Sequence, residues 1–148
     1  MNPVTIYTAG ICVDENTDSV TCAFGVFFST KSRLNKGQIT ASFTGGGVHA
    51  ALEGIRSVLQ SIYMHGSGPY MHIPVVIKTN VAEAAEYAKR PWTAPFECRE
   101  LAKIVKMLCC ERLLPARVEE YAQGDMALGG TEAVARALIA AQRSQRIE

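Results

Sequence analysis

The sequence predicts an α/β fold in which helices pack on a mixed five-stranded sheet, in the order β-β-β-α-β-α-α-β-α. Two observations predict this order: three strand-like segments come first, and helical and strand patterns alternate after them. The length of 148 residues and the 48% hydrophobic content suit one core. No repeat or linker interrupts the pattern, so we expect residues 1–148 to form a single domain.

The first third of the chain predicts three antiparallel strands. Residues 4–12 are rich in Val, Ile, Tyr and Thr, which favour strands. Polar residues at 14–19 predict a turn, and residues 20–29 follow closely enough to be the hairpin partner. Residues 38–44 alternate between apolar and polar side chains, as a third strand does.

After the glycines at positions 45–47, the apolar spacing becomes helical from about Val48. Residues 73–78 form a short apolar run, typical of a strand inside a parallel sheet. The remaining elements are expected to be a helix at 81–88, a proline-rich loop at 90–95, a helix at 96–113, a strand at 116–122, a loop at 123–130 and a helix at 131–143.

The charge balance and hydropathy limit the function classes. Fifteen basic residues against fourteen acidic ones give a net charge of +1, which argues against strong nonspecific binding to nucleic acid. No apolar stretch approaches the roughly twenty residues of a membrane helix, and the first residues lack a secretory signal pattern. We expect an intracellular, cytoplasmic location and no membrane contact.

The five cysteines are odd in number and lack the paired spacing of a zinc site. Because cytosolic thiols stay reduced, we expect free cysteines that pack as small apolar residues. No sequence pattern indicates a cofactor or a metal site.

Five local phrases resemble those of the ribonuclease H family, and together they cover essentially the whole chain. They are residues 6–12 (IYTAGIC), 23–28 (AFGVFF), 49–55 (HAALEGI), 76–80 (VIKTN) and 130–135 (GTEAVA). They occur in the family's order and on the corresponding predicted elements. The resemblance implies a ribonuclease H-like fold.

The resemblance also implies where the family's active site should lie. Family members cleave the RNA strand of a hybrid with four carboxylates that hold two divalent ions. In this chain those positions hold Ala9, Ala51, Asn80 and Ala135, none of which is acidic. Magnesium and manganese need hard, preferably anionic oxygen ligands, so we expect no metal and no nuclease reaction.

The family's contacts to an RNA/DNA hybrid are also missing. Its Asn residues before the first helix are replaced by residues 45–48, and the loop at 122–127 lacks the family's His. We therefore expect no RNA/DNA hybrid as a partner.

Several residues remain candidates for a different chemistry at the former site. His49, Asp125 and Glu132 could perform metal-free acid–base catalysis, with Asn80 as a hydrogen-bonding group and Cys12 as a nucleophile. Each also has a structural explanation, such as an early-helix acid stabilised by the helix dipole for Glu132 and a packed strand thiol for Cys12.

A basic stripe on the predicted helix at 96–113 is a further candidate binding surface. Arg99, Lys103 and Lys106 are spaced by four and three residues, and Trp92 lies nearby. They could contact phosphate and stack a base. The same pattern is typical of a solvated helix face balanced by neighbouring glutamates.

Our leading hypothesis is a non-nuclease binding or interaction module whose partner is a protein or a second copy of the chain. The alternative is a metal-independent enzyme that acts on a small organic molecule in the former active-site pocket. A second alternative is a residual nucleic-acid binder. Deliberate removal of the carboxylates to trap a substrate would also produce this sequence.

Overall fold

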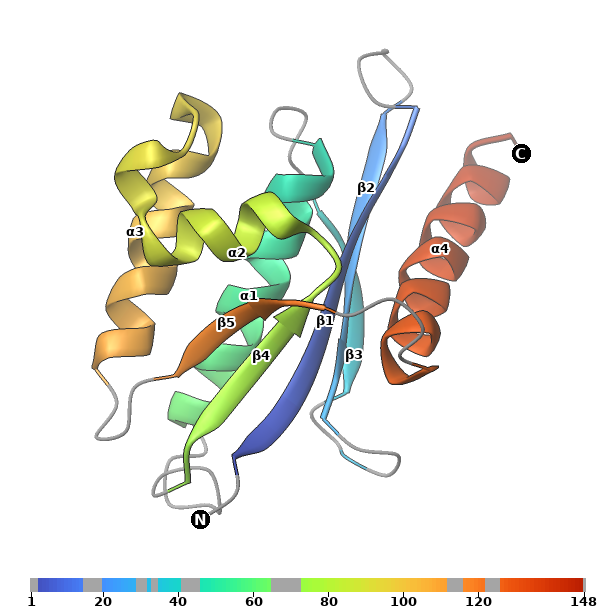
Figure 1. Cartoon of the computed structure of the whole chain (residues 1–148). Helices are drawn as coiled ribbons and strands as arrows, with labels where there is room; N and C mark the ends of the chain where they lie inside the picture. The colour runs from blue at the N-terminus through green and yellow to red at the C-terminus, as the bar shows by residue number, and fades with distance from the viewer. Residues whose placement is uncertain are drawn as a thin grey trace.

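Five strands form one mixed sheet in the order β3-β2-β1-β4-β5 (Figure 1). The strands are β1 (Val4–Val13), β2 (Thr21–Phe27), β3 (Lys36–Thr40), β4 (Val75–Thr79) and β5 (Arg117–Glu120). The first three pair antiparallel, while β4 pairs parallel with both β1 and β5. This confirms the predicted mixed sheet.

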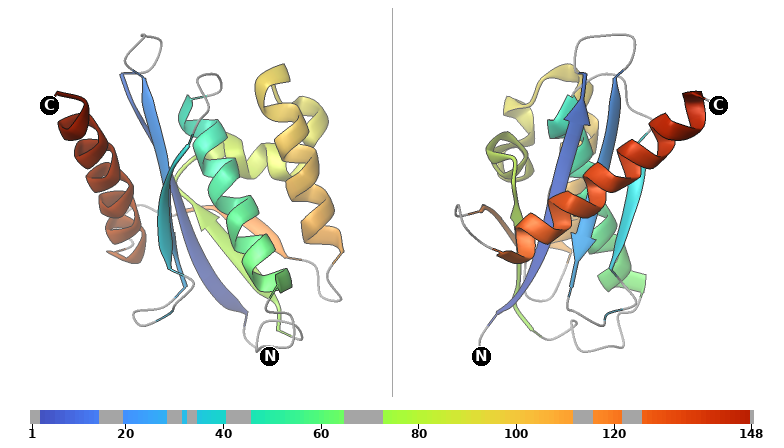
Figure 2. Two further views of the ribbon diagram at one scale, coloured as in Figure 1. Left: turned by 180° about the vertical axis from the view of Figure 1, so that it is seen from behind. Right: turned by 90° about the vertical axis from the view of Figure 1, so that its right-hand side faces the viewer.

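The helices cover both faces of the sheet. They are α1 (Gly46–Met64), α2 (Ala82–Lys89), the short 3-10 helix η1 (Pro91–Thr93), α3 (Phe96–Cys110) and α4 (Met126–Ile147). Figure 2 shows α1, α2 and α3 on one face of the sheet and α4 alone on the other. The computed structural model describes residues 3–14, 20–28, 32, 35–40, 46–64, 73–111, 116–121 and 126–147.

Alternation along β1 divides the core into two parts. Ile6 packs with Leu52 and Ile55 of α1 in the larger cluster, between the sheet and the three-helix face. Ile11 faces the other way and packs with Ile139 of α4 in a smaller cluster. The central strand is therefore covered on both faces, which places its backbone at the centre of the molecule.

The predicted order of elements is confirmed, but α4 begins earlier than expected. Residues 126–130, predicted as part of a loop, are helical. The two glycines at 129 and 130 suggested a break, yet a Cβ at Gly130 would have no neighbour within 4 Å, and glycine in an exposed helix costs only about 1 kcal/mol. Packing of α4 across β1 and β2 outweighs that cost. The third strand, predicted at residues 38–44, also begins earlier and is Lys36–Thr40 in the structure. Residues 41–45 lie outside the described residues.

The expectation of five free cysteines is wrong for two of them. Cys12 and Cys22 form a disulfide. The antiparallel register places them directly opposite each other on β1 and β2, with their Cα atoms 4.1 Å apart. The other three, Cys98, Cys109 and Cys110, are free as predicted.

Within the part of the chain that the structure describes, no helix is both long enough and apolar enough to cross a membrane.

Candidate functional site

The region that the family resemblance implies as an active site is built around Gly10, in the middle of β1. Helix α1 crosses β1 here so closely that a Cβ at Gly10 would lie against the backbone nitrogen of Ala51 and 2.6 Å from the carbonyl oxygen of Gly47. Only glycine permits this approach. Because position 10 has no side chain, the backbone of Ala51 can lie directly against the strand.

Asn80, which directly follows β4, reaches the same residue. Its Nδ2 donates a hydrogen bond to the carbonyl oxygen of Gly10 at 2.9 Å, and its Oδ1 accepts one from the Gly10 backbone nitrogen at 2.8 Å. The β1–β4 ladder ends at the pair Thr8 and Thr79, so the Asn80 side chain extends the connection between these strands. Both polar atoms of the amide have a protein partner.

Helix α4 closes the region from the opposite face of the sheet. A Cβ at Gly25 would lie 2.5 Å from the carbonyl oxygen of Thr131, and Gly25 is the cross-strand partner of Ala9. One helical turn further, Ala135 packs in the small cluster with Ile11. Of the positions implied by the family resemblance, Ala51 and Asn80 therefore contact Gly10, next to Ala9, and Ala135 packs near Ile11 on the other face of the sheet.

This region has the chemistry of a packed core. Ala9, Ala51 and Ala135 each have 0% of their surface exposed. Three methyl groups and one amide whose polar atoms are already paired offer no hard anionic ligand to a divalent ion. The described residues contain no group of three or more His, Cys, Asp and Glu side chains that could hold a metal.

His49 lies on α1, two residues before Ala51, and is partly buried. Its Nδ1 atom is buried and has no hydrogen-bond partner among the described residues. Burial lowers the pKa of His49, with Glu53 opposing the shift and Arg56 adding to it. Glu53 itself is paired with Arg56 at 2.6 Å. The neutral imidazole is therefore the favoured form.

The proposed acid–base residues are not brought together as a pair in the described structure. Glu132 lies on α4, on the opposite face of the sheet from α1 and His49 (Figure 2). Among the described residues, no hydrogen bond or ion pair joins their side chains. Asp125 lies outside the described residues. Cys12 is held in the disulfide and has no free thiol for nucleophilic attack in this form.

The basic stripe is exposed on α3, as its spacing predicts, but Arg99 makes hydrogen bonds to the backbone while Lys103 and Lys106 are exposed to solvent. The Arg99 guanidinium donates two hydrogen bonds, at 3.2 and 2.9 Å, to the carbonyl oxygen of Ala94 just before the helix. Lys103 and Lys106 are exposed, and Trp92 on η1 has 69% of its surface exposed. Arg99 therefore stabilises the start of α3 as well as adding charge.

Two surface features are not evident from the sequence pattern. The pattern predicts Phe96 only as the start of a helix, whereas in the structure it is 87% exposed. Its position off the buried stripe of Leu101 and Val105 is a signal that could have revealed this. The second feature is a cavity at β5 lined by Lys106 and Arg117, which depends on contacts between distant segments and leaves no local pattern.

No family model and no curated protein sequence matches this chain. Solved structures do match. The N-terminal ribonuclease H domain of a Mycobacterium tuberculosis protein, solved as a fusion with maltose-binding protein, has a TM-score of 0.72 at 11% identity, and the match covers 97% of this chain and 99% of that one.

Two further structures agree. A ribonuclease H1 isolated from compost by a metagenomic approach, solved in complex with an RNA/DNA hybrid, has a TM-score of 0.71 at 12% identity over 90% of this chain and 94% of that one. Ribonuclease H1 of the archaeon Halobacterium salinarum has a TM-score of 0.68 at 11% identity over 91% and 96% of the two chains. At these identities the likeness shows the fold alone. The chain has a ribonuclease H-like fold.

Proposed function

We propose that this protein is a binding module on a ribonuclease H-like fold, without metal-dependent nuclease activity. The observation that carries the proposal is the state of the four positions around Gly10. Three are alanines at 0% exposure, and the fourth is Asn80, whose amide is hydrogen-bonded at both ends to Gly10. Two-metal hydrolysis needs several carboxylates at one place, and these side chains do not supply them.

The same packing favours a binding function over an enzyme that uses the former pocket. A small-molecule site is normally concave and has a few unpaired polar groups. Here the alanine side chains are closed from solvent and the Asn80 amide is already paired. Two cavities in the part of the chain that the structure describes are lined by other side chains.

For the binding surface we propose the η1–α3 junction. Trp92 and Phe96 are 69% and 87% exposed, and Pro95 between them is also exposed. Exposed aromatic side chains next to a basic residue such as Arg99 are typical of protein interface centres. The partner is a protein, which includes a second copy of this chain.

The nuclease part of the proposal is tested with purified protein and a labelled RNA/DNA hybrid. We expect no cleavage above the buffer background with either Mg²⁺ or Mn²⁺, and no heat of Mg²⁺ binding by calorimetry. Circular dichroism of the same sample confirms that it is folded. Metal-dependent cleavage that elutes with the protein on gel filtration would contradict the proposal.

The surface is tested by sedimentation velocity over a range of concentrations, and by cross-linking in the cell followed by mass spectrometry. We expect self-association or a cross-linked protein partner that is lost in Trp92→Ser/Phe96→Ser and kept in the exposed control Val134→Ser. A wild-type pattern in the double variant would reject this surface. Salt-dependent hybrid binding that is lost in Lys103→Gln/Lys106→Gln would favour the nucleic-acid alternative instead.

A further inference from the structure

A cavity lies on the face of the sheet that α4 covers, which is the other face from the contact between Gly10 and α1. Its volume of about 520 Å³ is within the range of about 300–1,000 Å³ that is typical of small-molecule sites. It is lined by the end of β2, the start of β3 and the first half of α4. Figure 2 shows α4 running obliquely across the strands on this face.

Alternation along β2 and β3 decides which strand side chains face this cavity. Gly25 and Gly37 are cross-strand partners, and a Cβ on either would meet residues of α4. Phe27 follows Gly25 by two residues in the same strand, so its ring faces the α4 side and lines the cavity. Val26 and Lys36 are paired with each other on the opposite face, where Val26 belongs to the larger core cluster. The strands therefore supply an aromatic wall, and the side chain of Lys36 starts away from the cavity.

Helix α4 forms the opposite wall with Gly130, Thr131 and Val134. Val134 is a large apolar residue that is 48% exposed, whereas Thr131 is buried. A Cβ at Gly130 would meet no atom within 4 Å. The cavity therefore continues as open space beside Gly130, next to the exposed methyl groups of Val134.

Neither backbone conformation nor close packing requires a glycine at position 130. The residue lies inside α4, and its φ is not in the left-handed region. Glycine in a helix interior costs about 1 kcal/mol relative to alanine. Its small size does keep the space between α4 and the strands open, which is what a bound molecule at this place would need.

The polar side chains around the cavity already have partners within the protein. The Asn35 Oδ1 accepts a hydrogen bond from the Phe28 backbone nitrogen at 2.6 Å, and Thr131 is also engaged. Among the described residues that line the cavity, Lys36 is the single charged one, and it belongs to the other face of the sheet. A molecule in this cavity would therefore be held by apolar contact and shape.

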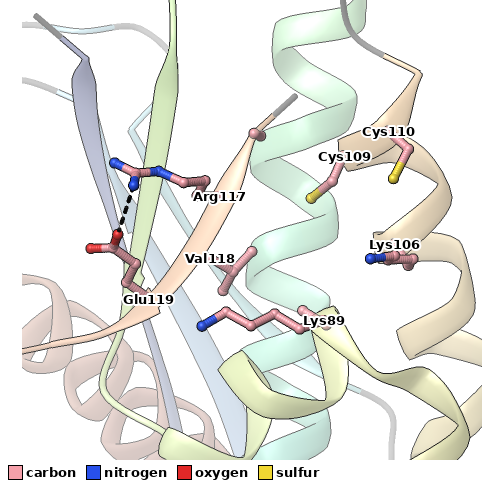
Figure 3. Close-up of a pocket in the computed structure, with 9 residues that line it drawn as sticks. Lys89, Lys106, Cys109, Cys110, Arg117, Val118 and Glu119 are labelled. Atoms are coloured by element: carbon pink, nitrogen blue, oxygen red, sulfur yellow. Dashed lines mark ion pairs between the residues drawn. The ribbon is translucent and has the colours of Figure 1, made fainter. Parts of the chain in front are cut away.

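The cavity at β5 has a different character. It is smaller, at about 340 Å³, and several charged residues line it. Figure 3 shows Val118 facing this cavity from β5, while the Arg117 guanidinium lies on the other side of the strand beside Glu119. Because the charges of Arg117 and Lys106 do not converge on one place, the cavity beside α4 is the better defined ligand site.

We propose that the cavity between α4 and the β2–β3 strands binds a small, uncharged aromatic molecule. Its planar ring system lies between Phe27 and Val134 and fills the space beside Gly130. Aromatic rings gain contact energy from one another beyond the area that they bury. A charged molecule would lose its hydration here without gaining an ionic partner. The proposal concerns a different surface from the η1–α3 junction and is independent of the proposed function.

The class of ligand is tested with a matched set of two-ring probes. They are 2-naphthol, which is planar and uncharged, 2-decalol, which is uncharged but saturated, 2-naphthoate and 2-naphthylmethylammonium. Methyl NMR signals of Val134 report binding beside α4, and those of Val118 report binding at the β5 cavity. We expect saturable shifts of Val134 with 2-naphthol, and dissociation constants at least about fivefold higher for each of the other three probes. Absence of saturable Val134 shifts, shifts confined to Val118, or equal affinity for any other probe would overturn the proposal.

The place of the site is tested by adding the same side chain at two positions of α4. Gly130→Leu fills the space beside the helix, whereas Ala137→Leu adds a leucine at an exposed position that does not line the cavity. We expect Gly130→Leu to weaken 2-naphthol binding at least about tenfold, through lost apolar contact, and Ala137→Leu to keep the wild-type affinity. Circular dichroism must show both proteins to be folded. Unchanged affinity in Gly130→Leu would refute the site.

Two further variants test how the molecule is recognised. Phe27→Leu keeps an apolar side chain but removes the ring, so it should weaken 2-naphthol binding by about threefold. Lys36→Gln removes the charged residue of the cavity lining and should leave the affinity unchanged. A wild-type affinity in Phe27→Leu would contradict the aromatic contact, and a large loss in Lys36→Gln would contradict recognition without charge.

Discussion

Asn80 illustrates how one atom decides the role of a residue at this site. Its amide both donates to and accepts from the Gly10 backbone. An ionised aspartate is an acceptor only, so one of its oxygens would face the Gly10 carbonyl oxygen without a proton between them. The amide is therefore required by the strand contact in this structure.

We predict that Asn80→Asp lowers the free energy of unfolding by about 2 kcal/mol at neutral pH, measured by urea denaturation. At about pH 4 part of the loss should be recovered, because a protonated carboxyl can donate to Gly10 as the amide does. Gln60→Glu makes the same chemical change at an exposed position of α1 and should have little effect. An Asn80→Asp protein as stable as the wild type would show that the two hydrogen bonds contribute nothing.

The lowered pKa of His49 predicts that the stability of the protein depends on pH. Burial lowers its pKa in the folded protein below the ordinary value of 6.5, so the unfolded chain takes up a proton first as the pH falls. Protonation of the unfolded state then draws the equilibrium away from the folded state. Stability contributed by neutral His49 is present above about pH 6.5 and is lost as the pH falls toward the lowered pKa of the folded state.

Urea denaturation of the wild type and of His49→Gln between about pH 7.5 and about pH 5.5 tests this. The wild type should lose more stability on acidification than the variant, which has no titrating group at this position. The difference between the two proteins removes the contributions of all other groups. Parallel pH curves would refute the role of His49.

At the scale of elements, the contact between α1 and β1 depends on Gly10. A methyl group there would meet the backbone of Ala51 and Gly47, which cannot move as a side chain can. We expect Gly10→Ala to lower the free energy of unfolding by about 3 kcal/mol. Gly130→Ala is the matched control, since a Cβ at Gly130 has open space on α4.

Gly130→Ala should raise stability by roughly 0.5–1 kcal/mol, because alanine favours a helix over glycine. Both proteins are compared with the wild type by urea denaturation. If Gly10→Ala raised the free energy of unfolding as Gly130→Ala is expected to do, the close approach of α1 to β1 at Gly10 would be wrong.

The disulfide joins β1 and β2 at one register position and closes a short loop, with a sequence separation of 10. Closing a loop of this length restricts the unfolded chain and is worth about 2.5–3 kcal/mol. We expect Cys12→Ser/Cys22→Ser to lose about this much stability in urea, and Cys110→Ser to lose none. Titration of the unfolded wild type without reductant should give three thiols, and five thiols would contradict the disulfide.

At the scale of the whole molecule, the positions that the family resemblance implies for an active site are part of the interior. Ala9, Ala51 and Ala135 tie β1, α1 and α4 together with no exposed surface. A carboxylate at each of these positions would be buried without the metal ions that offset its charge in a working nuclease. Small uncharged side chains at these positions are therefore what the closed packing requires.

We predict that Ala135→Asp destabilises the protein by about 3–5 kcal/mol, while Ala140→Asp at an exposed position of the same helix changes stability by less than about 1 kcal/mol. The quadruple variant Ala9→Asp/Ala51→Glu/Asn80→Asp/Ala135→Asp should be unfolded at neutral pH and should not cleave a hybrid with Mg²⁺. A folded, cleaving quadruple variant would show that the metal geometry survives.

Much of the fold could be predicted from the sequence because its signals are local. The change from strand alternation to helical spacing after residue 45 and the apolar run before Lys78 are visible within a short window. The start of α4 was misplaced because glycines 129 and 130 give a local break signal, whereas packing on β1 and β2 is a long-range effect.

The sequence by itself determined the order of the elements and the residue types at positions 9, 51, 80 and 135, none of which is acidic, since both depend only on residue identity and local pattern. Only the tertiary structure decided what these residues do. Asn80 and Gly10 are 70 residues apart, and Cys12 meets Cys22 only in one strand register. The cavity at β5 likewise requires α2, α3 and β5 to meet. Such contacts depend on how the elements pack in three dimensions, and a local window cannot contain them.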